Sequence, residues 1–138
     1  MVDTLVDAGP LFAVICRDDP LHERCAHELA RLVPPLYTTL PVLTEAMYLL
    51  GRWTLHGQMG LWTMLLRGDL NIADLTRPDL HRMSELMAKY GELPMDFADA
   101  SLVAVAERLG VDRVFTVDRA DFSVYRLHGT KPFTILGP

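Results

Sequence analysis

The stretch VDTLVDAGP, residues 2–10, determines the first element of the fold. Residues 2–6 are mostly β-branched or apolar, which favours a strand, and Gly9 with Pro10 stops that strand and opens the next element. Asp7 follows the strand directly. The stretch therefore predicts a strand with an acidic residue at its carboxyl end.

Short apolar runs alternate with helical patterns over the rest of the chain. Further strands are expected at residues 36–38, 70–73, 114–117 and 133–136. Helices are expected at residues 11–15, 21–33, 41–50, 58–66, 78–90 and 94–109. Asp19-Pro20 is expected to cap the second helix, Pro94 to begin the last one, and Gly51 and Gly110 to end the helices that precede them. This alternation predicts an α/β fold of three layers, α/β/α, around a central, mainly parallel five-stranded sheet.

Length and composition narrow the class of protein. The 138 residues predict one domain, 1–138, and 50% hydrophobic with 22% charged residues argue against disorder. The longest apolar run, residues 11–16, is far shorter than the roughly 20 residues that cross a bilayer, and the N-terminus lacks the basic start of a signal peptide. We expect a cytoplasmic protein without a membrane span, with Cys16 and Cys25 reduced. The net charge of −5 provides no general attraction for nucleic acid, so RNA binding would need local chemistry.

Two acids follow predicted strands. Asp7 ends the first strand and Asp118 ends the fourth. Because the functional crevice of an open parallel sheet lies beyond the carboxyl ends of its strands, these two side chains are expected to meet there. An Asp after a strand is also a common turn or helix-cap residue, so each one alone is weak support.

Two further acids lie near helix N-termini on predicted apolar faces. Glu45 shares a face with Val42, Tyr48 and Leu49, and Asp99 shares one with Leu102, Val103 and Ala106. A carboxylate on a buried face is costly unless it is paired or bound to a cation, and no Lys or Arg occupies a matching position. All-oxygen ligands select hard ions, so the set predicts a site for Mg²⁺, with Mn²⁺ as a substitute. Helix capping and helix-dipole stabilisation are the alternative explanation.

Two auxiliary acids lie near this set. Asp96 comes three residues before Asp99, and Asp121 comes three residues after Asp118. Each is expected to be either an auxiliary metal ligand or a structural acid, with Asp96 as a helix-dipole partner and Asp121 as the N-cap of a short helical turn.

Four motifs occur in register along the chain, and together they resemble the PIN-domain family, in particular the VapC-type toxins of bacterial toxin-antitoxin pairs. The motifs are LVDAGPL at residues 5–11, LTEA at 43–46, DASLVA at 99–104 and FTVDRADF at 115–122. The resemblance implies a PIN-like fold, a Mg²⁺-dependent endoribonuclease site, a homodimer, and inhibition by a small antitoxin whose tail enters the active-site groove. The family's acidic set falls on Asp7, Glu45, Asp99 and Asp118, and its hydroxyl falls on Thr116.

Other interpretations remain beside this one. A PIN-like module that only binds RNA or protein would keep the fold without catalysis. An aspartyl-phosphate phosphotransfer domain is less favoured, because no DxDxT motif includes Asp7 and Lys131 precedes the last strand. The tryptophans and most methionines lie on helix patterns and are expected in the core or at a dimer interface; they are Trp53, Trp62, Met47, Met59, Met64, Met83 and Met87.

Overall fold

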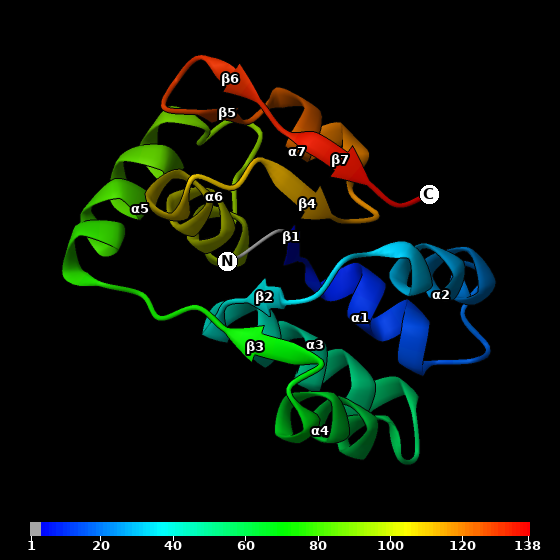
Figure 1. Ribbon diagram of the computed structural model, residues 1–138. Helices are drawn as coiled ribbons and strands as arrows, with labels where there is room; N and C mark the ends of the chain where they lie inside the picture. The colour runs from blue at the N-terminus through cyan, green and yellow to red at the C-terminus, as the bar shows by residue number, and fades with distance from the viewer. Residues whose placement is uncertain (1–3) are drawn as a thin grey trace.

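The computed structural model describes residues 4–138 and contains a five-stranded parallel sheet (Figure 1). The sheet order is β3-β2-β1-β4-β7. These strands are β1 (Thr4–Val6), β2 (Leu36–Thr38), β3 (Leu70–Ile72), β4 (Arg113–Phe115) and β7 (Thr134–Leu136). The predicted parallel sheet is confirmed, while the part of the first strand predicted at residues 2 and 3 lies outside the described residues.

Helices cover the sheet on both sides, which confirms the three-layer arrangement. They are α1 (Ala8–Ile15), α2 (His22–Arg31), α3 (Leu40–Trp53), α4 (Gly57–Arg67), α5 (Arg77–Lys89), α6 (Phe97–Leu109) and α7 (Arg119–Val124). Figure 1 shows α5 and α6 on one side of the sheet and α1 with α2 on the other. Helix α3 packs against α1 and α4, and it also contacts α6. A small antiparallel pair, β5 (Arg126–Leu127) and β6 (Lys131–Pro132), follows α7 and was not predicted.

Several helix boundaries differ from the prediction because capping side chains decide them. Helix α1 begins at Ala8, since Asp7 caps it and Pro10 is tolerated in a first turn. Helix α6 begins at Phe97 rather than at Pro94, because the cap is Asp96. Helix α2 begins at His22 without a side-chain cap, and Asp19 instead accepts a hydrogen bond from the Leu21 amide, at 2.9 Å.

Helix α3 also differs from the prediction, because it continues past Gly51 to Trp53. Gly110, in contrast, ends α6 as expected, in a left-handed conformation with φ of 70°. A glycine is tolerated inside a helix at a modest cost and ends one only where the chain turns left-handed.

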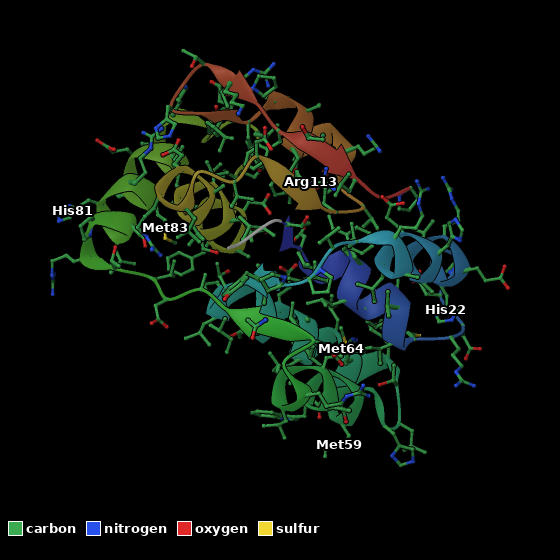
Figure 2. All side chains as sticks on the ribbon, in the orientation of Figure 1. His22, Met59, Met64, His81, Met83 and Arg113 are labelled. Atoms are coloured by element: carbon green, nitrogen blue, oxygen red, sulfur yellow. The ribbon has the colours of Figure 1, made fainter. Side chains whose placement is uncertain are left out.

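The core forms where the sheet meets the helices. Leu5, Val6, Val114 and Phe115 of the two central strands are almost fully buried. Met83 on α5 is 1% exposed and belongs to this core, whereas Met59 on the outer side of α4 is 65% exposed (Figure 2).

Some of the tryptophans and methionines that were predicted in the core or at an interface therefore lie in the core, and others are exposed. Met47 and Met64 pack against the core, while Trp53, Trp62 and Met87 are exposed. Interface packing stays a prediction for the exposed group. Both cysteines are free thiols, and no helix in the described part of the chain is long and apolar enough to cross a membrane.

Candidate metal centre

Asp7 lies at the carboxyl end of β1, where the parallel register pairs Val6 with Phe115 of β4. Its amide donates a hydrogen bond to the Phe115 carbonyl, at 2.9 Å. Its Oδ1 accepts a hydrogen bond from the Ala8 amide and its Oδ2 accepts one from the Thr116 hydroxyl, both at 2.8 Å. The carboxylate is buried, and both of its oxygens are held in place. Asp7 is thus a helix cap and a member of the strand-end site at once, and Thr116 positions it.

Asp118 lies beyond the end of β4, next to the same hydroxyl. Its amide donates to the Thr116 Oγ1, at 3.0 Å, so one threonine contacts both strand-end acids. Asp118 is the N-cap of α7, where its Oδ1 accepts a hydrogen bond from the Asp121 amide, at 3.2 Å. The expectation that Asp121 caps this turn is therefore wrong, since Asp121 lies inside the first turn of the helix that Asp118 caps.

Helix α6 supplies two more acids, and its cap decides how they lie. Asp96 is the N-cap, with its Oδ1 accepting a hydrogen bond from the Asp99 amide at 2.7 Å. Asp99 is 8% exposed, as its predicted apolar face requires. The Asp99 Oδ2 accepts a hydrogen bond from the hydroxyl of Tyr125, at 2.7 Å. Asp96 is therefore the cap rather than only a dipole partner inside the first turn.

The face of α3 that carries Glu45 is not buried at Glu45, contrary to the prediction. Its side chain is exposed, and its neighbour Tyr48 on the same face is 64% exposed. The residues that α3 buries are Val42, Leu43, Ala46 and Leu50. Because successive residues turn by about 100° around a helix, Glu45 falls beside the buried stripe rather than inside it. This position still lets Glu45 and Leu49 line the same pocket as Asp7.

A pocket of about 220 Å³ brings all the predicted acids together. Its lining residues are Asp7, Ala8, Gly9, Glu45, Leu49, Pro94, Asp96, Asp99, Val117, Asp118 and Asp121. No Lys or Arg occurs among them. Gly9 permits the close approach of α1 to the end of β4, because a Cβ at this position would lie 2.5 Å from the Val117 Cγ2.

The tightest acidic group in the pocket includes one of the auxiliary residues. Asp99, Asp118 and Asp121 each offer a carboxylate oxygen, and these oxygens lie within 4.8 Å of one another. Asp7 and Glu45 line the pocket outside this triad. The structure therefore brings Asp121 closer to the centre of the acidic site than the sequence suggested.

Crowding of carboxylates in a buried place favours their protonated forms. Burial raises the pKa of Asp99 to about 8, although the Tyr125 hydrogen bond acts in the opposite direction. Burial also raises the pKa values of Asp7, Glu45 and Asp121, and the charges of neighbouring carboxylates add to each increase. A cation can replace these protons, and a pocket lined by carboxylates without a basic residue fits a hard divalent ion.

The basic residues closest to the motifs have other partners. The Arg119 guanidinium donates to the carbonyls of Gly137 and Pro138, at 2.9 and 3.1 Å. The Arg52 guanidinium lies 5.3 Å from the ring centre of Trp53. Neither arginine lines the acidic pocket.

Tyr125 is the residue at this site that sequence reasoning missed. It follows α7 and lies 26 positions from Asp99 along the chain, so no helical or strand spacing relates the two. A single tyrosine after a short helix carries no recognisable signal.

This fold, with acids gathered at the ends of β1 and β4, defines the class of protein. The PIN domain family matches residues 4–126, and the chain belongs to that family. The resemblance inferred from the four motifs is therefore confirmed.

Individual relatives are more distant and cover nearly the whole chain. The chain is similar to Ribonuclease VapC26 of Mycobacterium tuberculosis, with 23% identity over 133 residues that cover 96% of this chain and 98% of that protein. Among solved structures it resembles M. tuberculosis VapC20, described as a sarcin-ricin loop cleaving toxin, with a TM-score of 0.77, 21% identity, and coverage of 86% and 94% of the two chains. A toxin-antitoxin complex from Klebsiella pneumoniae matches with a TM-score of 0.68, 17% identity, and coverage of 88% and 92%.

Proposed function

We propose that this chain is a metal-dependent endoribonuclease and the toxin of a toxin-antitoxin pair, with residues 1–138 forming one nuclease domain. The observation that carries the proposal is the buried carboxylate of Asp99, which lies among other carboxylates in a pocket with no Lys or Arg in its lining. Such a group is costly without a cation. Membership of the PIN family and similarity to a protein named Ribonuclease VapC26 support phosphodiester hydrolysis as the chemistry.

We assign the cation to Mg²⁺, or to Mn²⁺ in its place, because every polar side chain in the pocket lining is a carboxylate. Asp7, Glu45, Asp99 and Asp118 are the proposed ligands and catalytic acids, and Asp96 and Asp121 are auxiliary. When bound, such an ion lowers the pKa of water and stabilises the charge that develops on a phosphodiester.

The residues of the chain prepare the site for that chemistry. Thr116 holds one oxygen of Asp7 and the Ala8 amide holds the other, so this carboxylate keeps one orientation. Asp99 lies at the buried side of the pocket, where it is largely shielded from water, and Glu45 lies at the exposed side. An acidic pocket would repel RNA by itself, and a bound cation reverses the local charge.

The partners of this function are an RNA substrate and a small antitoxin protein. The Klebsiella relative was solved as a toxin-antitoxin complex, which supports a protein inhibitor for this chain as well. We further propose a homodimer in the cytoplasm, with the antitoxin tail entering the acidic pocket. A phosphotransfer domain is less well supported, because no Lys lines the pocket beside Asp7.

The test is cleavage of RNA by the purified chain with a defined metal supply. EDTA should abolish cleavage, Mg²⁺ or Mn²⁺ should restore it, and Asp99→Asn should nearly eliminate it. Glu85→Gln is the matched control, because it removes a carboxylate from a side chain that is 70% exposed and does not line the pocket. Full cleavage in EDTA would contradict the metal requirement. A chain that binds its antitoxin but cleaves no RNA with either ion would instead be a non-catalytic module.

A further inference from the structure

The proposed metal ligands do not explain the buried hydroxyl of Tyr125. Its side chain is 0% exposed, and its oxygen lies 2.7 Å from the Asp99 Oδ2. We infer that Tyr125 is a positioning residue that holds one oxygen of Asp99 and leaves the other oxygen for the cation. This inference rests on the proposed function, because it concerns how the proposed metal site is built.

The tyrosine ring is held by aromatic side chains on two sides. Phe122 lies edge-to-face with it, with ring centres 5.1 Å apart and an angle of 80° between the rings. Tyr90, at the end of α5, makes a similar contact at 5.2 Å and 68°. Phe122 in turn packs on Phe133, at 5.5 Å. Edge-to-face contacts of this kind restrict the ring, so the position of the Tyr125 hydroxyl is fixed by packing.

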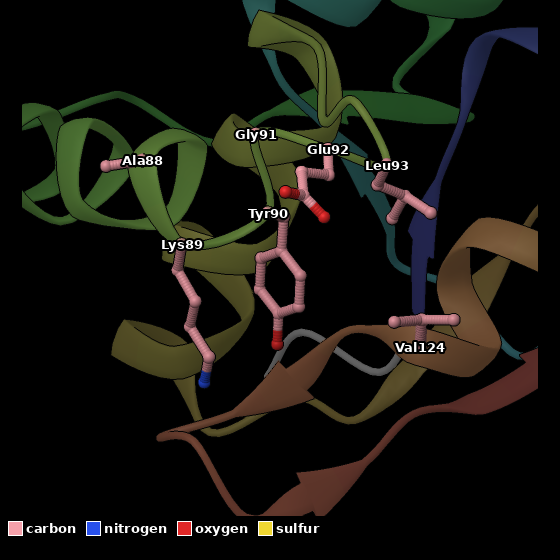
Figure 3. Close-up of a pocket in the computed structure, with 7 residues that line it drawn as sticks. All are labelled: Ala88, Lys89, Tyr90, Gly91, Glu92, Leu93 and Val124. Carbon is pink, nitrogen blue, oxygen red and sulfur yellow. The ribbon is translucent and has the colours of Figure 1, made fainter.

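Tyr90 is itself fixed at the other end of its ring. Figure 3 shows the Tyr90 ring extending from the end of α5 toward the chain that follows Val124. Its hydroxyl accepts a hydrogen bond from the Arg126 amide, at 3.1 Å. Tyr90 therefore supports Tyr125 by packing, and its hydroxyl bonds to the Arg126 amide rather than to Asp99, which makes it a suitable control.

The hydroxyl bond selects the orientation of the Asp99 carboxylate. The Asp99 amide is held by the Asp96 cap, but the terminal torsion of an aspartate is soft and roughly two-fold. The described part of the chain supplies no second donor to this carboxylate. Asp7 differs, because both of its oxygens accept hydrogen bonds. Among the described residues, the Tyr125 hydroxyl thus makes the one hydrogen bond to the Asp99 carboxylate.

The same bond connects the two helices that carry the acidic triad. Asp118 and Asp121 lie at the start of α7, and Asp99 lies on α6. Tyr125 follows α7 directly, and its amide donates to the Asp121 carbonyl, at 3.2 Å. Through its hydroxyl, the end of α7 is attached to the ligand on α6. We therefore expect the loss of this hydroxyl to weaken metal binding through Asp99.

The experiment measures Mn²⁺ binding rather than activity. Electron paramagnetic resonance detects free Mn²⁺ and yields dissociation constants for wild type, Tyr125→Phe and the control Tyr90→Phe. Removal of a residue that orients a metal ligand typically weakens metal binding 10- to 100-fold, and we expect about a 10-fold higher Kd for Tyr125→Phe. The Mn²⁺ Kd of Tyr90→Phe should lie within about 2-fold of the wild-type Kd, which is a smaller change than the 10- to 100-fold range. Melting temperatures in EDTA show whether each variant is folded.

A second comparison separates orientation of Asp99 from a general structural effect. In an Asp99→Asn background, Tyr125→Phe should change the Mn²⁺ Kd by less than about 2-fold, because the two residues act as one unit. An unchanged Kd for Tyr125→Phe, an equal loss in Tyr90→Phe, or a full further loss in the Asp99→Asn background would each overturn the inference. Wild-type protein that binds no Mn²⁺ would contradict the proposed function and the inference with it, whereas wild-type binding that Tyr125→Phe leaves intact contradicts the inference alone.

Discussion

The acidic pocket should make the metal-free protein less stable as the pH rises, and Asp99 should contribute to this loss together with Asp7, since burial raises the pKa of both. The pKa of Asp99 is about 8 in the folded chain, against an ordinary value of 3.8. Between these two pH values the folded chain retains a proton that the unfolded chain has released. The free energy of unfolding therefore falls as the pH rises from about 4 to about 8. The stability associated with protonated Asp99 is fully present only below that pH window.

The size of the effect follows from the shift. Each pKa unit corresponds to about 1.4 kcal/mol, so the shift of Asp99 sets a ceiling of about 6 kcal/mol. Crowded carboxylates share protons and titrate together, so we expect a measured loss of about 2 to 4 kcal/mol. Asp99→Asn removes the titrating group, and an asparagine can still accept the Tyr125 hydrogen bond through its side-chain oxygen. In EDTA at pH 8 this variant should be more stable than wild type by a similar amount.

Urea unfolding in EDTA at several values between pH 5.5 and 8.5 measures both chains. We expect the wild-type stability to fall across this range, the curve of Asp99→Asn to be flatter although Asp7 still titrates in it, and Mn²⁺ to restore the stability of wild type at pH 8 because it binds only the folded chain. The pKa of Glu107 is lowered in the folded state, so this group makes the stability rise with pH. That rise occurs only below the pH range of the assay. Equal slopes for the two chains, or an Asp99→Asn variant that is less stable than wild type at pH 8, would refute the reasoning.

Four substitutions test the geometry of the site. Asp7→Asn should leave the chain folded while lowering RNA cleavage by orders of magnitude, and a marked fall in the melting temperature would show that capping is its main role. Asp96→Asn should cost about 1 kcal/mol or less in urea unfolding, because Asn is also a good N-cap, and it should reduce cleavage modestly. Asp99→Asn should nearly abolish cleavage. If a cleavage assay shows a larger loss for Asp96→Asn than for Asp99→Asn, the metal site must be reassigned by one helical turn. Gly9→Ala should destabilise the chain by about 1 to 3 kcal/mol in the same unfolding assay, because its methyl group would meet Val117, and an unchanged stability would contradict that contact.

Much of the fold could be predicted from sequence because its signals are local. Short apolar strands that alternate with helices indicate a parallel sheet, and an acid directly after such a strand lies at the sheet's carboxyl edge. Asp7 and Asp118 were located in this way, and the structure places both in one pocket. Asp99 was located by its predicted apolar face, and the structure buries it together with every other residue from Ala98 to Ala106 of α6.

Helix boundaries and helix faces were predicted less well, because small rotations and single caps decide them. Asp96 begins α6 and Asp7 begins α1, so each helix starts where a side chain accepts an amide hydrogen bond rather than where a proline occurs. Glu45 lies one position from the buried Ala46, and a turn of about 100° separates an exposed carboxylate from a buried methyl group. Sequence spacing identified Glu45 for a reason that the structure does not support, although Glu45 does line the pocket.

The parallel sheet, the strand-end acids and the resemblance to the PIN-domain family follow from sequence alone, because each depends on residues that are close together in the chain or on short motifs in a fixed order. Which acids meet most closely, and what holds them, depends on how the helices pack. Asp121 joins the triad from the first turn of α7, which Asp118 caps, and Tyr125 reaches Asp99 with its ring packed against two other aromatic rings. The hydrogen bond between Tyr125 and Asp99 joins residues 26 positions apart, and no periodic pattern in a chain encodes such a contact.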